Sequence, residues 1–262
     1  MTEILLWNAA VVATLMTGTW LVSLVLHNVS IVDIIWGLGF VAIAWTTWMI
    51  AHSDNRSLLL PTLTTVWGLR LSGHLAWRNH GQPEDFRYRS MRERHGKRFW
   101  WVSAITVFLL QGIVMWVVSL PIQASQCGSF QHQALVLFGC AVWLVGLIFE
   151  SVGDLQLARF RANPENSNAV MDQGLWRFTR HPNYFGDFCV WWGIFLISYG
   201  CGAAIATVAS PVLMSILLMK FSGVALLEKT LVSRREGYAD YVQRTSAFFP
   251  MPVRNRNFAE NQ

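Results

Sequence analysis

The segment 174–187, GLWRFTRHPNYFGD, holds the densest group of side chains able to bind a ligand. Proline disfavours helical geometry at the residue before it and suits the first turn of a helix, so a helix is predicted to begin at Pro182. The free N–H groups and the dipole at that helix start attract anions, and nearby arginines bind phosphate or carboxylate groups. An acidic side chain on the first turns can accept hydrogen bonds from a ribose or an amide. The side chains that carry this prediction are Arg177, Arg180, His181, Asn183, Tyr184 and Asp187.

A second polar group lies just upstream. Glu150 and Asp154 stand four residues apart and Arg161 follows seven residues after Asp154, so the three share one face of a helix. Carboxylates within a hydrophobic helix are costly and usually face a bundle interior or a cavity. The pattern indicates either a ligand-binding face or a structural pairing of Asp154 with an arginine.

Polar residues also interrupt the N-terminal half. Asp33 breaks an apolar run at SIVDIIWG, and Arg70 breaks another at WGLRL. His74 and the loop 82–88, QPEDFRY, come next. Asp33 and Arg70 either pair with each other near a membrane surface or face a substrate.

The tail has a weaker signal. Glu228 ends a long apolar run, and Gly237, Tyr238 and Tyr241 follow on a predicted short amphipathic helix. Taken alone, this pattern is typical of an interfacial helix without chemistry.

The elements that must position these residues are membrane helices. Hydrophobic residues make up 53% of the 262 and charged residues only 13%, against about 25% in soluble domains. A hydrocarbon core of about 30 Å needs roughly 20 apolar residues per helix. The sequence predicts an all-α, polytopic membrane domain over residues 1–262. Its seven predicted spans are Leu5–Leu26, Ile31–Ile50, Leu58–Trp77, Phe99–Val118, Ala134–Val152, Tyr184–Tyr199 and Ala203–Leu227.

Lysine and arginine set the predicted orientation. They gather in the segments 78–98 and 153–182 and in the tail after Glu228, whereas 120–133 and 200–202 have none. Seven spans place these basic segments in the cytoplasm and the N-terminus outside. Topology thus accounts for the net charge of +5, and no basic face with interleaved aromatics is left for nucleic acid.

Cysteine usage gives no sign of metal or redox chemistry. Cys127, Cys140, Cys189 and Cys201 form no Cys-x-x-Cys pair, so structural thiols and no metal site are expected. No protein partner is indicated.

The run RHPNYFGD, the helix with Asp154 and Arg161, and the tail with Glu228, Gly237 and Tyr241 together resemble the steroid 5-alpha-reductase superfamily. The likeness is closest to its bacterial branch with the C-terminal domain of 3-oxo-5-alpha-steroid 4-dehydrogenases, and sterol C14-reductases carry a similar segment. It is specific over roughly 146–250 and weaker over 30–98. The resemblance implies a bacterial inner-membrane bundle whose half 134–262 binds NADPH at the cytoplasmic face. Residues 1–133 would then form the side that admits a lipophilic substrate.

When the family's cofactor-binding residues are matched to this sequence position by position, the resemblance implies a set of cofactor contacts. Asn183 matches the family's nicotinamide- or ribose-binding asparagine, Asp187 its acidic partner, and Arg70 a phosphate-binding arginine on the third span. The remaining implied contacts are Asp154, Arg161, Arg177, Arg180, His181, Tyr184, Glu228 and Tyr241.

The carbonyl-polarising residues depart from the family pattern. The family uses a Gln-Glu pair on the second helix and a tyrosine on the third. Here Asp33 stands at the Glu position after Val32, and Trp67 stands near the tyrosine position and has no phenol. Asp33 is therefore expected to act with another donor, Tyr88 or His74, unless the substrate is not a 3-oxo-Δ4 steroid. Asp33 and Tyr88 are the predicted catalytic residues. Asp33 is the predicted acid, because a carboxyl in apolar surroundings has a raised pKa and can be protonated near neutrality.

The leading hypothesis is an NADPH-dependent reductase of a carbon–carbon double bond in a membrane-soluble, steroid-like or other enone substrate. The first alternative is a membrane methyltransferase of the isoprenylcysteine or phospholipid type. Those enzymes use S-adenosylmethionine and also carry an Arg-His-Pro-x-Tyr-x-Gly segment. The second alternative is a catalytically inactive lipid-binding membrane protein.

Overall fold

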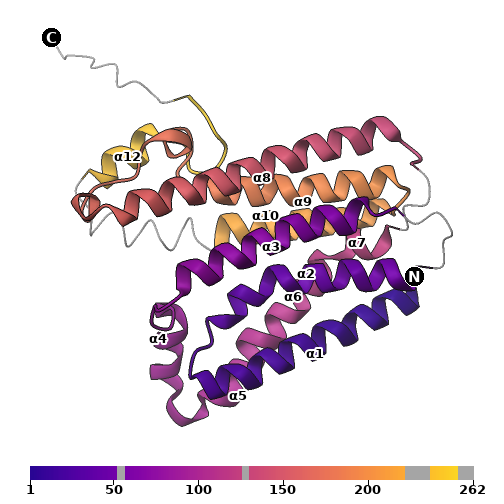
Figure 1. Cartoon of the computed structure of the whole chain (residues 1–262), viewed down its shortest axis with the longest axis horizontal. Coiled ribbons are helices and arrows are strands. Elements are labelled where there is room, and N and C mark those ends of the chain that lie inside the picture. The colour runs from indigo at the N-terminus through magenta and orange to yellow at the C-terminus, as the bar shows by residue number, and fades with distance from the viewer. Residues whose placement is uncertain (52–56, 126–129, 222–236, 253–262) are drawn as a thin grey trace. The chain divides into compact units, whose positions relative to one another are not determined.

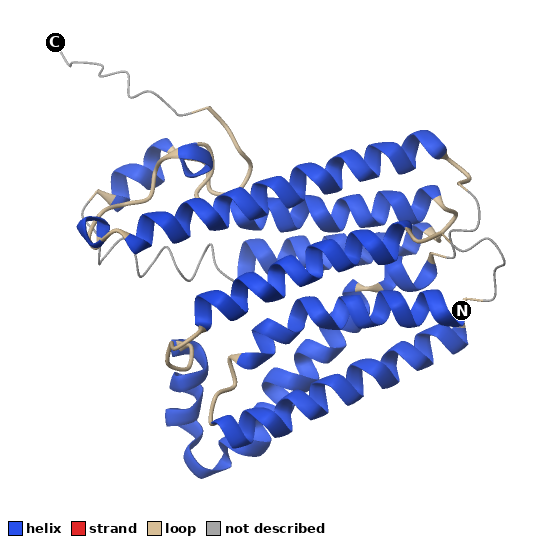
Figure 2. Ribbon diagram, in the orientation of Figure 1, coloured by secondary structure: helices blue, strands red, loops and turns tan. Residues whose placement is uncertain are grey.

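The computed structural model describes residues 1–51, 57–125, 130–221 and 237–252. Within these ranges the chain is helical, apart from one isolated parallel bridge between Thr179 and Ser246 (Figure 2). The helical fold class is confirmed.

Four helices are long and apolar enough to cross a membrane: Thr2–Leu26, Ile31–Ile50, Phe86–Val118 and Gln133–Ala162. They coincide with the first, second, fourth and fifth predicted spans. Helices α3 (Leu59–Asn79) and α9 (Pro182–Gly200) coincide with the third and sixth. The seventh, Ala203–Leu227, extends beyond the described residues. The count of seven and the orientation stay predictions.

The chain divides into two compact units, and each is described by itself. Unit 1 comprises Met1–Val136 and Ile194–Ser210, and unit 2 comprises Leu137–Gly193 and Pro211–Gln262. The elements that lie wholly in unit 1 are α1 (Thr2–Leu26), α2 (Ile31–Ile50), α3, α4 (Phe86–His95), η1 (Gly96–Arg98), α5 (Phe99–Ser103), η2 (Ala104–Leu109), α6 (Leu110–Val118), α7 (Leu120–Ala124) and η5 (Ile205–Val208) (Figure 1).

Helices α2 and α3 pack through two facing glycines. A Cβ built on Gly37 would lie 2.4 Å from the Gly68 carbonyl oxygen, and one built on Gly68 would lie 2.6 Å from the Gly37 carbonyl oxygen. Small residues let membrane helices approach this closely. Beside this crossing Trp67 is fully buried with its ring edge-on to Phe40, so its indole belongs to the packed interior of unit 1.

Unit 2 contains most of α8 (Gln133–Ala162) and the first part of α9, with η3 (Pro164–Asn166), η4 (Gly174–Arg177), η6 (Leu217–Phe221) and α12 (Tyr238–Arg244). Helix α10 (Ala209–Ile216) begins at the end of unit 1 and continues into unit 2. Helix α9 begins at Pro182 as predicted. The fifth span was predicted to end at Val152, but α8 continues to Ala162 and carries Asp154 and Arg161.

Helices α8 and α9 touch backbone to backbone at glycines spaced by seven residues. A Cβ on Gly186 would lie 2.5 Å from the Glu150 nitrogen, and one on Gly193 would lie 2.7 Å from the Trp143 nitrogen. At the start of α9, Gly153 approaches Pro182, where an added Cβ would lie 3.1 Å from Pro182 Cγ. Seven residues are close to two helical turns, so these contacts recur along one face and fix the register of the two helices.

The cysteines differ in part from expectation. Cys140 and Cys189 are free thiols, as predicted, whereas Cys201 is disulfide-bonded. Cys127 lies outside the described residues. Disulfides persist in oxidising compartments, and Cys201 lies at the turn 200–202, which is predicted to lie outside the cytoplasm.

Candidate functional site

Unit 1 brings the two predicted catalytic residues together. The Tyr88 hydroxyl on α4 donates a hydrogen bond to Oδ1 of Asp33 on α2, at 2.8 Å. The other Asp33 oxygen, Oδ2, accepts from the Arg87 guanidinium at 3.2 Å. Tyr88 is only 6% exposed, so its phenol is held away from bulk water. Both Asp33 oxygens accept hydrogen bonds in this arrangement, so Tyr88, and not the predicted Asp33, is the group with a proton to give.

Gln111 completes this polar group, and the sequence reasoning missed it. Its side-chain nitrogen on α6 lies 3.3 Å from the Tyr88 oxygen and donates to it. A phenol has one donor and two acceptor positions, so Tyr88 can bond Asp33 and Gln111 at once. A polar residue inside an apolar span was the available signal, because such residues usually face a bundle interior or a cavity.

A second ion pair holds α4 in place. Arg92 binds Glu84 with two hydrogen bonds, of 2.9 Å from Nε and 2.8 Å from a terminal nitrogen. Glu84 also accepts the Val29 N–H at 2.8 Å, and the Arg92 guanidinium stacks over the Phe99 ring at 4.5 Å. A further hydrogen bond joins the loop before α4 to the turn before α2: the Asp85 N–H donates to the Ser30 hydroxyl at 2.8 Å. The loop before α4 is thereby fastened to the turn between α1 and α2.

Hydrogen bonding determines the charge state of both loop carboxylates. Burial alone would raise the pKa of Glu84, but the hydrogen bonds from Arg92 and the Val29 N–H outweigh it, so the pKa lies below its ordinary value. Burial and Arg87 oppose each other in the same way at Asp85, whose pKa is also lowered. Both groups are ionised at neutral pH, as their ion pairs require.

Glu84→Gln is expected to lower the Tm, because one charged pair and its geometry are lost. For a partly exposed pair the cost is about 1 kcal/mol. A lowered pKa means that the carboxylate stabilises the fold above its unfolded-state pKa of 4.5, and that this contribution disappears as the pH falls through the lower folded-state pKa. The Tm difference between wild type and variant, measured by circular dichroism, should be constant from pH 6 to 8 and shrink below about pH 4.5. A difference that does not change with pH would show that Glu84 is not ionised in the fold.

Unit 2 pairs two of the residues predicted to bind the cofactor. The Asn183 side-chain nitrogen donates to Oδ1 of Asp154 at 3.1 Å, which joins the first turn of α9 to α8. Asn183 Oδ1 accepts the Tyr184 N–H at 3.1 Å. The rings of His181 and Tyr184 stack with centroids 5.4 Å apart. The motif RHPNY therefore forms one compact corner, with Asp154 as its partner on α8.

Two other predicted contacts are engaged by backbone. Arg180 is buried and donates to the carbonyl oxygens of Val242 and Thr245, at 2.9 and 2.6 Å. The Tyr241 hydroxyl, on α12, donates to the Trp176 carbonyl at 2.5 Å. Burial raises the pKa of Tyr241 and keeps the phenol neutral. The tail was read alone as an interfacial helix, but α12 is packed, and Arg180 and Tyr241 bind it to the segment 174–181.

The remaining predicted residues are dispersed. Arg177 and Arg161 are exposed, Asp187 lies on the second turn of α9, and Arg70 is half-buried on α3 of unit 1. His74, the other predicted donor for Asp33, has its ring 6.0 Å from that of Trp77. Glu228 lies outside the described residues. The binding roles of all these residues stay predictions.

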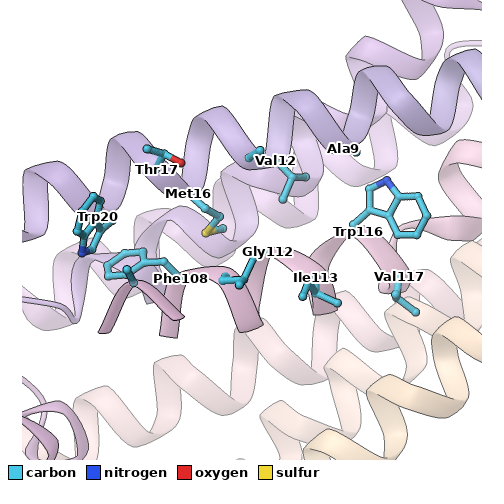
Figure 3. A pocket seen from close by; sticks show the side chains of 13 residues that line it. Ala9, Val12, Met16, Thr17, Trp20, Phe108, Gly112, Ile113, Trp116 and Val117 are labelled. Atoms are coloured by element: carbon cyan, nitrogen blue, oxygen red, sulfur yellow. The ribbon is translucent and has the colours of Figure 1, made fainter. Parts of the chain in front are cut away.

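An apolar groove of about 510 Å³ lies between α1 and the helix formed by η2 and α6. Figure 3 shows Trp20 and Trp116 at its two ends and Met16 and Phe108 along it. Both indole N–H groups are used internally, by the carbonyls of Trp100 and Leu5. The groove thus offers a hydrocarbon surface with few hydrogen-bond donors. Within the described ranges, no group of three His, Cys, Asp or Glu side chains could hold a metal ion.

The comparisons with known proteins place the chain in a family. The model described as "Protein of unknown function (DUF1295)" matches residues 19–245. This family is associated with the steroid 5-alpha-reductase superfamily. No curated protein and no solved structure matches the chain.

Proposed function

The chain belongs to the DUF1295 family, and we propose that it is a membrane-embedded, NADPH-dependent reductase of a carbon–carbon double bond conjugated to a carbonyl in a lipophilic substrate. The observation that carries the proposal is the Tyr88 hydroxyl, buried in an apolar unit and bonded to both Asp33 and Gln111. A positioned phenol of this kind can polarise a carbonyl and give it a proton.

The residues of unit 1 would act on the substrate carbonyl. NADPH, when bound, supplies the hydride that is added to the β-carbon of the enone. As the double-bond electrons move toward the carbonyl oxygen, the Tyr88 hydroxyl would turn from Asp33 to that oxygen, its O–H bond would break and its proton would pass to the oxygen. The resulting enol would become the saturated carbonyl compound as solvent protonates its α-carbon and takes the proton from its oxygen. The Gln111 N–H stabilises the phenolate left behind, and solvent returns the proton. Asp33, fixed by Arg87, orients the hydroxyl before the transfer.

The residues of unit 2 suit the proposed cofactor. The Asp154 carboxylate and the Asn183 amide offer hydrogen bonds to a ribose or a carboxamide, and the exposed Arg177 and Arg161 suit phosphates. Arg180 donates hydrogen bonds to two backbone carbonyls. We therefore assign it a structural role in this corner, and not primarily the binding of phosphate.

Purified protein is expected to bind NADPH saturably, and Asn183→Ala should weaken that binding by about tenfold or more. The substitution removes a hydrogen bond to a carboxylate and leaves Asp154 without the amide that positions it. Fluorescence titration with NADPH and with S-adenosylmethionine provides the measurement. Asn168→Ala is the matched control, because Asn168 is exposed and makes no hydrogen bond with a described residue.

The same titration separates the alternatives. Binding of S-adenosylmethionine alone would overturn the reductase and favour the methyltransferase. Binding of neither, together with no deuteride transfer from labelled NADPH across a panel of lipophilic enones, would favour a lipid-binding protein.

A further inference from the structure

Helix α4 and the turn after it carry two sets of basic side chains with different surroundings. Arg87 and Arg92 are paired, with Asp33 and Asp85 and with Glu84. A second set is exposed, and none of its side chains makes a hydrogen bond or an ion pair with a described residue. This set, the outer basic surface, consists of Arg89, Arg94, Lys97 and Arg98. The internal carboxylates therefore account for the first set only.

The outer basic surface adjoins an apolar span. The helical stretch Phe86–Val118 is long and apolar enough to cross a membrane, and these cations lie in its first thirteen residues. Trp100 and Trp101, which follow directly, are 55% and 44% exposed. Tryptophan with a free apolar face concentrates at membrane–water interfaces. The cations are therefore expected at the depth of lipid headgroups when this stretch spans a membrane.

The outer basic surface has few acidic residues near it in the sequence. Between residues 86 and 98 the only acidic residue is Glu93. A juxtamembrane cluster of four cations attracts acidic lipids by about 1 kcal/mol per charge near the surface, whereas a zwitterionic headgroup has no net charge to attract.

We infer that the outer basic surface is a binding site for the headgroups of anionic phospholipids. The inference is independent of the proposed reaction, because it rests on charges that the catalytic group does not use. It also has a consequence for that group. Tyr88 is on the buried side of the same helix, so lipids that hold the outer side of α4 also hold the helix that presents Tyr88.

The test compares lipid selectivity in reconstituted membranes. Wild-type protein in phosphatidylcholine vesicles is probed with spin-labelled phosphatidylglycerol and spin-labelled phosphatidylcholine, and the ratio of motionally restricted label gives the selectivity. The neutral variant carries Arg89→Gln, Arg94→Gln, Lys97→Gln and Arg98→Gln. Its preference for phosphatidylglycerol should fall about five-fold or more, which corresponds to about 1 kcal/mol. The charge-preserving variant, with Arg89→Lys, Arg94→Lys and Arg98→Lys, should keep the wild-type preference.

Two results would overturn the inference. One is a neutral variant with unchanged selectivity. The other needs only wild-type protein and so does not depend on the folding of a variant. Raising the salt concentration from about 0.01 to 1 M shortens the screening length from about 30 to 3 Å, and a preference that does not weaken over this range cannot arise from these exposed charges.

Discussion

Tyr88→Phe is expected to lower the rate of hydride transfer to a lipophilic enone by about 10²–10⁴-fold, the contribution of a positioned general acid. The substitution removes one oxygen and its proton and leaves the ring in place. Gln111 and Asp33 then lose their shared partner. Single-turnover kinetics with NADPH deuterated at C4 measures the step, and mass spectrometry of the product follows the label. NADPH affinity should change little, because Tyr88 is not among the proposed cofactor contacts.

Two variants accompany this experiment. Asp33→Asn should also slow transfer, but by less, because the hydroxyl survives while its orienting carboxylate and the pairing with Arg87 are lost. Tyr199→Phe is the matched control. Tyr199 is 36% exposed, its ring stacks on Phe195, and its hydroxyl makes no hydrogen bond with a described residue. Equal activity of Tyr88→Phe and Tyr199→Phe would exclude Tyr88 as the acid.

The helices themselves were predictable, because apolar runs of about 20 residues and the Pro182 start are local signals. The hydrogen bonds that join Asp33, Tyr88 and Gln111 were only partly predictable. Sequence logic named Tyr88 as one of two possible donors for Asp33. It could not give the contact itself, because 55 residues separate Tyr88 from Asp33 and helix packing alone brings them together. Gln111 is farther still from Asp33 in sequence, on a different helix.

Residues near the cofactor motif show a different limit. A motif gives residue types, and the surrounding chain decides which atoms remain available. Arg180 and Tyr241 have suitable chemistry for a phosphate or a ribose, yet they bond backbone carbonyls. Those contacts depend on where the tail packs, and the spacing of residues in the sequence does not predict that position.

The glycine spacing is a signal in the sequence from which no helix contact was predicted. Gly139, Gly146 and Gly153 recur every seven residues on α8, and Gly186 and Gly193 do so on α9. Repeated small residues two turns apart are a signature of closely packed membrane helices. These contacts place Asp154 beside Asn183, so they connect the packing of unit 2 to its proposed binding corner.

Gly186→Ala is therefore expected to destabilise unit 2 and to abolish NADPH binding within the measurable range. The new Cβ would lie 2.5 Å from the Glu150 nitrogen and 2.6 Å from the Gly146 carbonyl oxygen. Both are backbone atoms, so the helices must move apart, at a cost of about 1–3 kcal/mol or more. This movement lengthens the 3.1 Å hydrogen bond between Asp154 and Asn183. Thermal unfolding by circular dichroism and titration with NADPH report the two effects.

Gly18→Ala is the matched control for that substitution. Gly18 is also within a helix, α1, but nothing lies within 4 Å of its added Cβ. Alanine is favoured over glycine in a helix by roughly 0.5–1 kcal/mol, so this variant should unfold at the wild-type temperature or slightly above it. Wild-type NADPH affinity in a folded Gly186→Ala protein would show that close packing of α8 and α9 does not position the binding corner. A wild-type Tm as well would show that the two backbones are not in contact there.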